Sequence, residues 1–228
     1  MPNQFNEMSD SRTWNLLVGA ATRALEGAGF EPKRQPGRGR SNVWEIEENW
    51  ARKRVSIRTT KNRWFAFPPL RKGTKWKTLD DVDIVVVAAV DDRDDPNGVE
   101  VYRFDAGEVR KRFDQSYAAR IQAGQTVKDN FGMWVSLDAD DRGLPVSVGA
   151  GLATEHAPIA TYPLAELIAE NGPETVGGPG DGDTAAAAEA SGREATTIAE
   201  VMDWARKRIA TLSGVHMEAV KLECRIET

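Results

Sequence analysis

The chain has 228 residues, of which 40% are hydrophobic, so it can bury one substantial core in one or two domains. Its one cysteine, Cys224, excludes an internal disulfide framework, and Met1–Gln4 shows no signal-peptide pattern, which favours a reducing cytoplasm. The longest apolar run, Ile84–Val90, is far shorter than the roughly 20 residues that a bilayer-spanning helix needs. We therefore expect a soluble, cytoplasmic protein with no membrane partner.

The net charge of −5 conceals an uneven distribution of charge along the chain. Residues 33–77 hold 14 Lys and Arg against three acids, whereas residues 80–114 hold 11 acids against five bases. A basic face on an acidic protein is typical of a surface that binds phosphates. The alternative is a charged face that only meets solvent.

The N-terminal part of the chain predicts one helix. Residues 1–10 are mainly polar and are predicted to be disordered, and Asp10 or Ser11 is placed to cap a helix. Apolar residues then recur at helical spacing until Gly27, which predicts a helix with one face packed on a sheet. The next ten residues, 31–40, contain two prolines and four cations and predict a basic loop.

Residues 43–67 predict three strands. Apolar and polar residues alternate over 43–47 and 54–58, as in a half-buried antiparallel hairpin, and the reversal is expected at Asn49. Residues 64–67 follow a polar turn and predict a third strand that ends at Pro68–Pro69.

Tryptophans are concentrated in the basic segment, where an indole can stack on a base or on a guanidinium group. Trp44 is expected to face the core with Ile46, because large apolar residues on strands usually do. Trp50 lies at the hairpin turn, and Trp76 lies between two lysines of a second basic loop, residues 71–77. These two tryptophans are the candidates for exposed contacts.

The middle of the chain predicts a second hairpin and a second helix. Residues 84–90 form a continuous apolar run rich in valine, which indicates a central strand buried on both faces. Residues 91–98 have turn chemistry and 99–104 supply the partner strand. Helical spacing predicts a helix over residues 105–123, and residues 131–137 predict a further strand.

The C-terminal part predicts a separate small unit. Residues 162–170 are expected to form a short helix that starts at Pro163. Residues 171–195 are almost wholly Gly, Pro, Ala, Thr, Asp and Glu, which predicts a flexible linker. Residues 196–228 show a helical stripe and a short alternating pattern. Such a small helix–strand tail is expected to dock on a protein partner, a second copy or the main domain.

The order of elements over residues 11–137 resembles the core of the PD-(D/E)XK (restriction-endonuclease-like) superfamily. The segment Val55–Thr60 is similar to that family's third core strand, where an acid, any residue and a lysine precede Thr or Ser. Here Ser56 stands at the acid position and Arg58 at the lysine position. The resemblance implies a nuclease-like α/β domain over residues 11–170, with a mixed central sheet flanked by helices and nucleic acid, expected to be DNA, as its partner.

The departures from the family motif decide the expected activity. In the family, carboxylates hold a divalent cation that activates water, but Ser56 offers no carboxylate and Arg58 is fixed in charge. We therefore expect a non-catalytic nucleic-acid-binding accessory protein of a DNA-processing or defence system, without a cofactor. One alternative is an active Mg²⁺-dependent endonuclease whose carboxylates have migrated, and the other is a protein-interaction adaptor with a basic face. The candidate carboxylates are Glu26, Glu45 and Glu47.

Six residues are predicted to bind nucleic acid. Arg58, Lys61 and Arg63 lie on or just beyond the strand that faces nucleic acid in the resembling family. The others are Arg38 and Arg40, in the basic loop, and Trp76.

Other catalytic and metal-binding chemistry has little support in the sequence. His156 and His216 lie in different segments and show no metal-ligand spacing. Cys224 alternates with apolar residues as a core residue does, and the acidic run 91–95 lacks the spacing of a calcium loop. We interpret that run as a solvated hairpin tip.

Overall fold

The computed structural model describes residue 5, residues 8–35 and residues 43–170. The predicted linker, the predicted C-terminal tail and the loop cations Arg38 and Arg40 lie outside the described residues. Within the described ranges, no helix is both long enough and apolar enough to cross a membrane.

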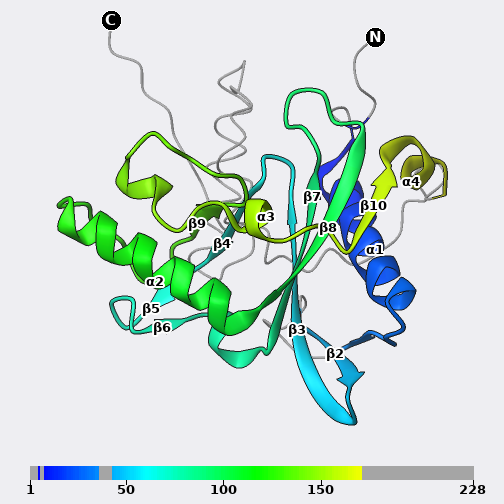
Figure 1. The fold of residues 1–228 in the computed structure, drawn as a ribbon, viewed down its shortest axis with the longest axis horizontal. Coiled ribbons are helices and arrows are strands. Elements are labelled where there is room, and N and C mark those ends of the chain that lie inside the picture. The colour runs from blue at the N-terminus through cyan, green and yellow to red at the C-terminus, as the bar shows by residue number, and fades with distance from the viewer. Residues whose placement is uncertain (1–4, 6–7, 36–42, 171–228) are drawn as a thin grey trace, which may run out of the picture. The chain divides into compact units, whose positions relative to one another are not determined.

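A six-stranded mixed sheet forms the centre of the fold, with the strand order β1-β2-β3-β7-β8-β10 (Figure 1). Strands β3 and β7 are parallel, and the other neighbouring strands are antiparallel. The predicted α/β class with a mixed central sheet is confirmed. The strands are β1 (Lys33–Arg34), β2 (Val43–Glu48), β3 (Ala51–Thr60), β7 (Ile84–Val90), β8 (Gly98–Asp105) and β10 (Ala160–Pro163).

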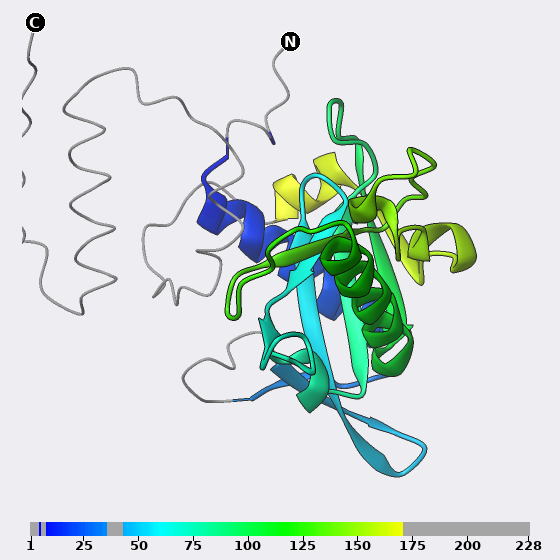
Figure 2. The same cartoon turned by 90° about the vertical axis from the view of Figure 1, so that its left-hand side faces the viewer.

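Strand β7 is buried along its whole length, as its valine-rich run predicts. Successive side chains of a strand point to opposite faces, so β7 contributes to two separate cores. Helix α1 (Asp10–Gly27) covers one face of the sheet, and helix α2 (Ala106–Gln122) lies over the other (Figure 2).

The first face is closed by α1 and by α4 (Leu164–Glu170). Ser9 caps α1 by accepting a hydrogen bond from the Arg12 backbone N–H, and the apolar face of the helix packs on β3 and β7. Phe5 is only 1% exposed because its ring fills the same core. Within the stretch predicted to be disordered, Phe5 is thus packed in the core, and α1 begins at Asp10, close to the predicted start of the first helix.

The second face is covered by α2 and by two small sheets. Strand β4 (Trp64–Phe67) pairs with β9 (Met133–Ser136), and β5 (Pro69–Leu70) pairs with β6 (Lys75–Trp76). Residues 64–67 and 131–137 thus contain strands, as predicted, but these strands pair with each other outside the main sheet. The reason is that β7 already occupies the edge of β3.

The predicted helix over residues 162–170 starts later than expected. Tyr162 and Pro163 belong to strand β10, and the helix begins only at Leu164. Pro163 is tolerated there because β10 is an edge strand, which needs no second hydrogen-bonding partner. The connections of the chain also contain the short elements η1 (Leu79–Asp81), η2 (Pro145–Ser147) and α3 (Leu152–Glu155).

Phe113 of α2 is central to the second core, and its removal tests that core. Its ring lies edge-on to those of Phe65, Phe67 and Trp76, with centroids 5.3–5.5 Å apart. Phe113→Ala is expected to lower the free energy of unfolding by about 3–5 kcal/mol, because it leaves a cavity among these rings.

A matched control exists on the same helix. Ile121 is 46% exposed, so Ile121→Ala is expected to change the free energy of unfolding by less than about 1 kcal/mol. Urea unfolding of both variants measures the difference, and equal losses of stability would contradict the packing described.

Candidate nucleic-acid interface

Strands β2 and β3 continue beyond the rest of the sheet as a two-stranded ribbon. Strand β1 pairs with β2 only at Trp44 and Glu45, and β7 first pairs with β3 at Val55. Among the described residues, no third strand pairs with residues 46–54, which project from one end of the sheet (Figure 1). Side-chain and loop contacts still tie this stretch to the domain, through Glu48 to Arg103 of β8 and through Arg54 to Asp83. We call residues 46–54 the ribbon. Its reversal at Asn49 confirms the predicted hairpin.

The charges at the base of the ribbon balance one another. Glu45 lies opposite Arg54 and Glu47 lies opposite Arg52 across the strand pair, and all four side chains share one face. Arg52 also forms an ion pair with Glu45, at 3.8 Å. With Glu48 and Lys53 included, the ribbon holds two acids and three bases, so its own excess of positive charge is small.

Trp50, at the tip of the ribbon, is 96% exposed. This confirms its predicted exposure. Trp44 is half-buried and packs against the core beneath α1, as predicted.

Trp76 is fully buried, so its predicted exposure is wrong. Its indole N–H donates a hydrogen bond of 2.7 Å to Asp114 of α2, and its ring meets those of Phe113 and Tyr117. Helix α2 therefore supplies a hydrogen-bond acceptor for the indole N–H and aromatic contacts for the ring. The two flanking lysines gave no sign of this burial in the sequence. Trp76 thus anchors the β5–β6 hairpin on the helix.

The anchoring of Trp76 directs its neighbours outward. Side chains alternate along a strand, so Lys75 and Lys77 project away from the core that holds Trp76. The turn of the same hairpin presents Arg71 and Lys72, both exposed.

Residues 128–130 lie along this hairpin. The Asn130 backbone N–H donates to the carbonyl of Pro69, and Asp129 accepts from the Lys72 backbone N–H, which brings the exposed Lys128 next to the hairpin. We call Arg71, Lys72, Lys75, Lys77 and Lys128 the cation surface. Among the residues that the structure describes, none of these five side chains has an acidic partner in an ion pair.

The turn that carries Arg71 and Lys72 has one fixed shape. Arg71, Lys72 and Gly73 all have positive φ, and a Cβ on Gly73 would lie 2.6 Å from the Tyr117 ring. Glycine is therefore required at this position. The backbone of the cation surface is held in place rather than free to adapt.

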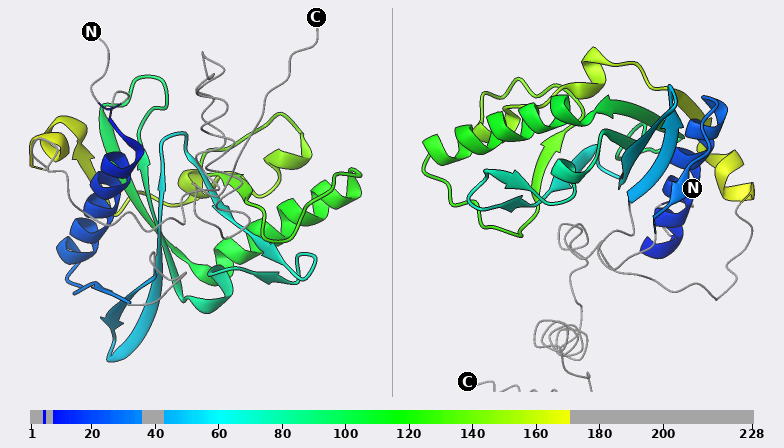
Figure 3. Two further views of the ribbon diagram at one scale, coloured as in Figure 1. Left: turned by 180° about the vertical axis from the view of Figure 1, so that it is seen from behind. Right: turned by 90° about the horizontal axis from the view of Figure 1, so that it is seen from below.

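In Figure 1 the ribbon projects from the lower end of the sheet, and the β5–β6 hairpin extends sideways below α2; Figure 3 shows the same arrangement from behind. Residues after Lys77 run through η1 to Asp83, and there the Arg54 backbone N–H donates to the Asp83 carboxylate at 2.8 Å. This is the end at which the parallel strands β3 and β7 contact each other first.

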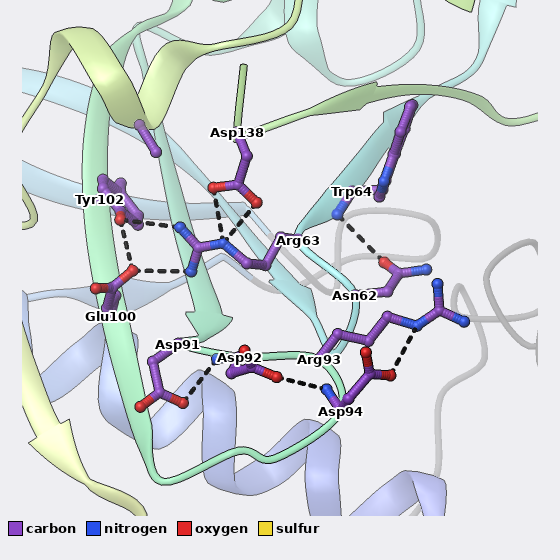
Figure 4. A pocket seen from close by; sticks show the side chains of 11 residues that line it. Asn62, Arg63, Trp64, Asp91, Asp92, Arg93, Asp94, Glu100, Tyr102 and Asp138 are labelled. Atoms are coloured by element: carbon purple, nitrogen blue, oxygen red, sulfur yellow. Dashed lines mark hydrogen bonds and ion pairs between the residues drawn. The ribbon is translucent and has the colours of Figure 1, made fainter. Parts of the chain in front are cut away.

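Arg63 lies at the opposite end, where β3 and β7 terminate. Its Nε donates to both oxygens of Asp138, and Nη1 donates to the Val90 carbonyl and to Glu100, at 2.8–2.9 Å (Figure 4). Nη2 donates to the Tyr102 hydroxyl, which in turn donates to Glu100. The side chain is 12% exposed and ties the small β4–β9 sheet to the main sheet.

These contacts hold Arg63 in its charged form. Burial alone would lower the pKa of Arg63, but its hydrogen bonds to Tyr102, Glu100 and Asp138 raise it above the usual value. Burial and the hydrogen bond to Glu100 raise the pKa of the Tyr102 hydroxyl as well. The guanidinium group is thus used within the fold. The predicted contact of Arg63 with nucleic acid stays a prediction, and the structure shows the side chain bound to Glu100, Asp138 and the Val90 carbonyl.

An open hollow of about 530 Å³ surrounds the Arg63 cluster. Four aspartates and Glu100 line it, together with two arginines, so its lining is mainly acidic and does not suit a polyanion. Lys61, close by, is exposed and forms an ion pair with Asp10, at 3.1 Å. Arg58 is half-buried, and its guanidinium carbon lies 4.3 Å from the centre of the Phe67 ring.

The three candidate carboxylates do not come together. Trp44 and Ile46 face the core beneath α1, so Glu45 and Glu47 project to the opposite side of the sheet. Burial raises the pKa of Tyr162, and Glu26 is close enough to add to that rise, which puts Glu26 near β10. Strands β2 and β10 are separated by β3, β7 and β8.

The residues at the family's catalytic position do not fit Mg²⁺. Ser56 is 0% exposed and has no carboxylate, and Glu45 is paired with Arg52. In the part of the chain that the structure describes, no three acidic, histidine or cysteine side chains are grouped as metal ligands.

Sequence reasoning missed most of the cation surface. Residues 71–77 form a visible basic loop, but the order of the resembling family's strands directed attention to Lys61 and Arg63 instead. Lys128 carries no local signal, because only tertiary contacts bring it to the hairpin.

Comparisons with protein-family models, curated proteins and solved structures find no match for this chain. Membership of the PD-(D/E)XK superfamily therefore stays a prediction.

The structural role of Arg63 can be tested by substitution. Arg63→Ala is expected to lower the free energy of unfolding by about 3 kcal/mol, because Glu100 and Asp138 lose their shared partner. Arg63→Lys is expected to recover only part of this loss, since an ammonium group cannot reproduce the planar fork.

Lys61→Ala is the control, because it removes a cation two residues away in an exposed ion pair. It is expected to cost less than about 1 kcal/mol. If urea unfolding finds Arg63→Ala no more destabilising than Lys61→Ala, Arg63 does not hold the two sheets together.

Proposed function

We propose that this protein binds nucleic acid, in particular DNA, through the phosphate backbone, and that the cation surface is its contact site. The observation that carries the proposal is the grouping of five Lys and Arg side chains without acidic partners among the described residues. These groups keep their hydration and counterions in the free protein. Phosphates can therefore displace those counterions without first breaking an ion pair.

The charge of the remaining chain supports a confined contact. The net charge is −5, so a polyanion is repelled by most of the surface and attracted only where cations are in local excess. The acidic hollow around Arg63 lies at the other end of the sheet. Nucleic acid approaching the protein is thus steered toward the cation surface.

The chemistry of the cation surface favours binding without sequence preference. Lysine ammonium groups act as point charges on flexible stems, and phosphate contacts position a protein without reading bases. Four of the five side chains are lysines. We propose that this protein binds DNA of many sequences with similar affinity.

We also propose that the protein does not cleave the nucleic acid that it binds. This part of the proposal is supported by the burial of Ser56 and by the separation of Glu26 from Glu45 and Glu47. The suggested accessory role in a DNA-processing or defence system rests on the family resemblance alone.

Removing two cations tests where the phosphates bind. For Lys72→Ala/Lys77→Ala, we expect weaker binding to duplex DNA. A plot of log affinity against log salt should also become less steep by up to about two, because each phosphate contact contributes about −0.9 to the slope. Fluorescence anisotropy across a range of salt concentrations measures both quantities.

The matched control is Lys61→Ala/Arg93→Ala, which removes the same charge from the end of the sheet where β3 and β7 terminate. It is expected to leave the slope unchanged. If the slope flattens in the control but not in the Lys72/Lys77 variant, the phosphates bind at the end of the sheet that holds Arg63 and not at the cation surface. If an acidic polypeptide binds the cation surface and duplex DNA does not compete, the protein is an adaptor instead.

Cleavage can be tested separately from binding. We expect no hydrolysis of single- or double-stranded DNA above background with either Mg²⁺ or Mn²⁺, because no three acidic, histidine or cysteine side chains are grouped as metal ligands among the described residues. Metal-dependent cleavage that Glu45→Gln or Glu26→Gln abolishes would show that the endonuclease alternative is correct.

A further inference from the structure

The tip of the ribbon combines exposure with backbone strain at one residue. Trp50 has a φ of 63° and Asn49 a φ of 52°, so both adopt the left-handed conformation. Glu48 pairs with Ala51, which makes residues 49–50 a two-residue loop with the φ signs of a type I′ turn. Such turns favour Asn followed by Gly. Asn49 fits this pattern, whereas the Trp50 side chain is sterically disfavoured at its position.

Folding gives no reason for tryptophan at this position. Its side chain is 96% exposed and buries almost no apolar surface, and a glycine would adopt the same φ without strain. Residues held in disfavoured backbone conformations cluster at functional and ligand-binding sites. Trp50 therefore points to a ligand outside the chain.

The ribbon carries Trp50 away from the body of the domain. Four residues of β3, from Ala51 to Arg54, lie beyond the first pair with β7, which places the tip about 13 Å past the end of that pairing. The ribbon holds two acids, Glu47 and Glu48, against three bases, Arg52, Lys53 and Arg54, so its own excess of positive charge is small. The five cations of the cation surface supply the larger excess that attracts phosphates.

We infer that Trp50 stacks on an unpaired base of a nucleic acid whose backbone is held by the cation surface, so that the protein prefers single-stranded or locally unpaired strands. This inference rests on the proposed function. Every base has a π-face on which an indole can stack, regardless of sequence. In an intact duplex both faces of a base are covered by neighbouring pairs, and Trp50 then has no surface to stack on.

The test compares two substitutions in the same turn of the full-length protein. Trp50→Gly removes the indole, whereas Asn49→Gly changes the adjacent left-handed residue and keeps the indole. Each variant is titrated with an oligo(dT) strand and with a duplex of the same length at one salt concentration. Trp50→Gly is expected to weaken oligo(dT) binding about tenfold and to leave duplex binding within about twofold. Asn49→Gly is expected to change neither.

Two further readouts separate stacking from a structural effect. Trp50→Phe should retain part of the single-strand affinity, since a phenyl ring also stacks. Quenching of tryptophan emission by oligo(dT) should be present in the wild type and lost in Trp50→Gly. The unfolding midpoint of Trp50→Gly should equal or exceed that of the wild type, because glycine suits this φ.

Each result decides the inference. Unchanged oligo(dT) affinity in Trp50→Gly, or an equal loss on oligo(dT) and duplex, overturns it and leaves the proposed function standing. A protein ligand at Trp50 would give the first of these results. If the wild type binds neither probe, the proposed function fails and the inference fails with it.

Discussion

Strand β7 must be covered on both faces, and most of the architecture follows from this requirement. All seven of its residues, Ile84–Val90, are buried, so water has to be excluded from each side of the sheet. Helix α1 covers one side. On the other side, the chain between β3 and β7 crosses the sheet as β4, β5, β6 and η1, and α2 packs on it with Phe113.

This crossing segment also creates the proposed contact site. It must return to the start of β7, because β7 is parallel to β3, and the β5–β6 hairpin therefore lies at the end of the sheet from which the ribbon projects. Trp76 secures the hairpin to α2 through Phe113 and Asp114. The same burial that stabilises the second core turns Lys75 and Lys77 outward, so packing and function are coupled at one residue.

Local patterns predicted the elements of the fold, and tertiary pairing decided what they could not predict. The valine run of β7, the reversal at Asn49 and the amphipathic helix α1 depend on short-range periodicity and turn chemistry, which a sequence displays directly. The partner of β4 is about 70 residues away, and so is the carboxylate of Asp138 that binds Arg63. Nothing within a strand's length of Arg63 indicates that its charge is neutralised inside the fold.

The candidate site was only partly visible for the same reason. A count of charges identifies the basic segment, residues 33–77. It cannot distinguish cations that form ion pairs with acids from cations that contact only solvent. The central claim is that nucleic acid contacts the two hairpins at one end of the sheet. Backbone amide chemical shifts, followed by NMR while a short oligonucleotide is added to the ¹⁵N-labelled protein, test this directly. The account predicts changes concentrated at residues 49–54 and 71–77, and changes confined to the surroundings of Lys61 and Arg63, or none at all, would contradict it.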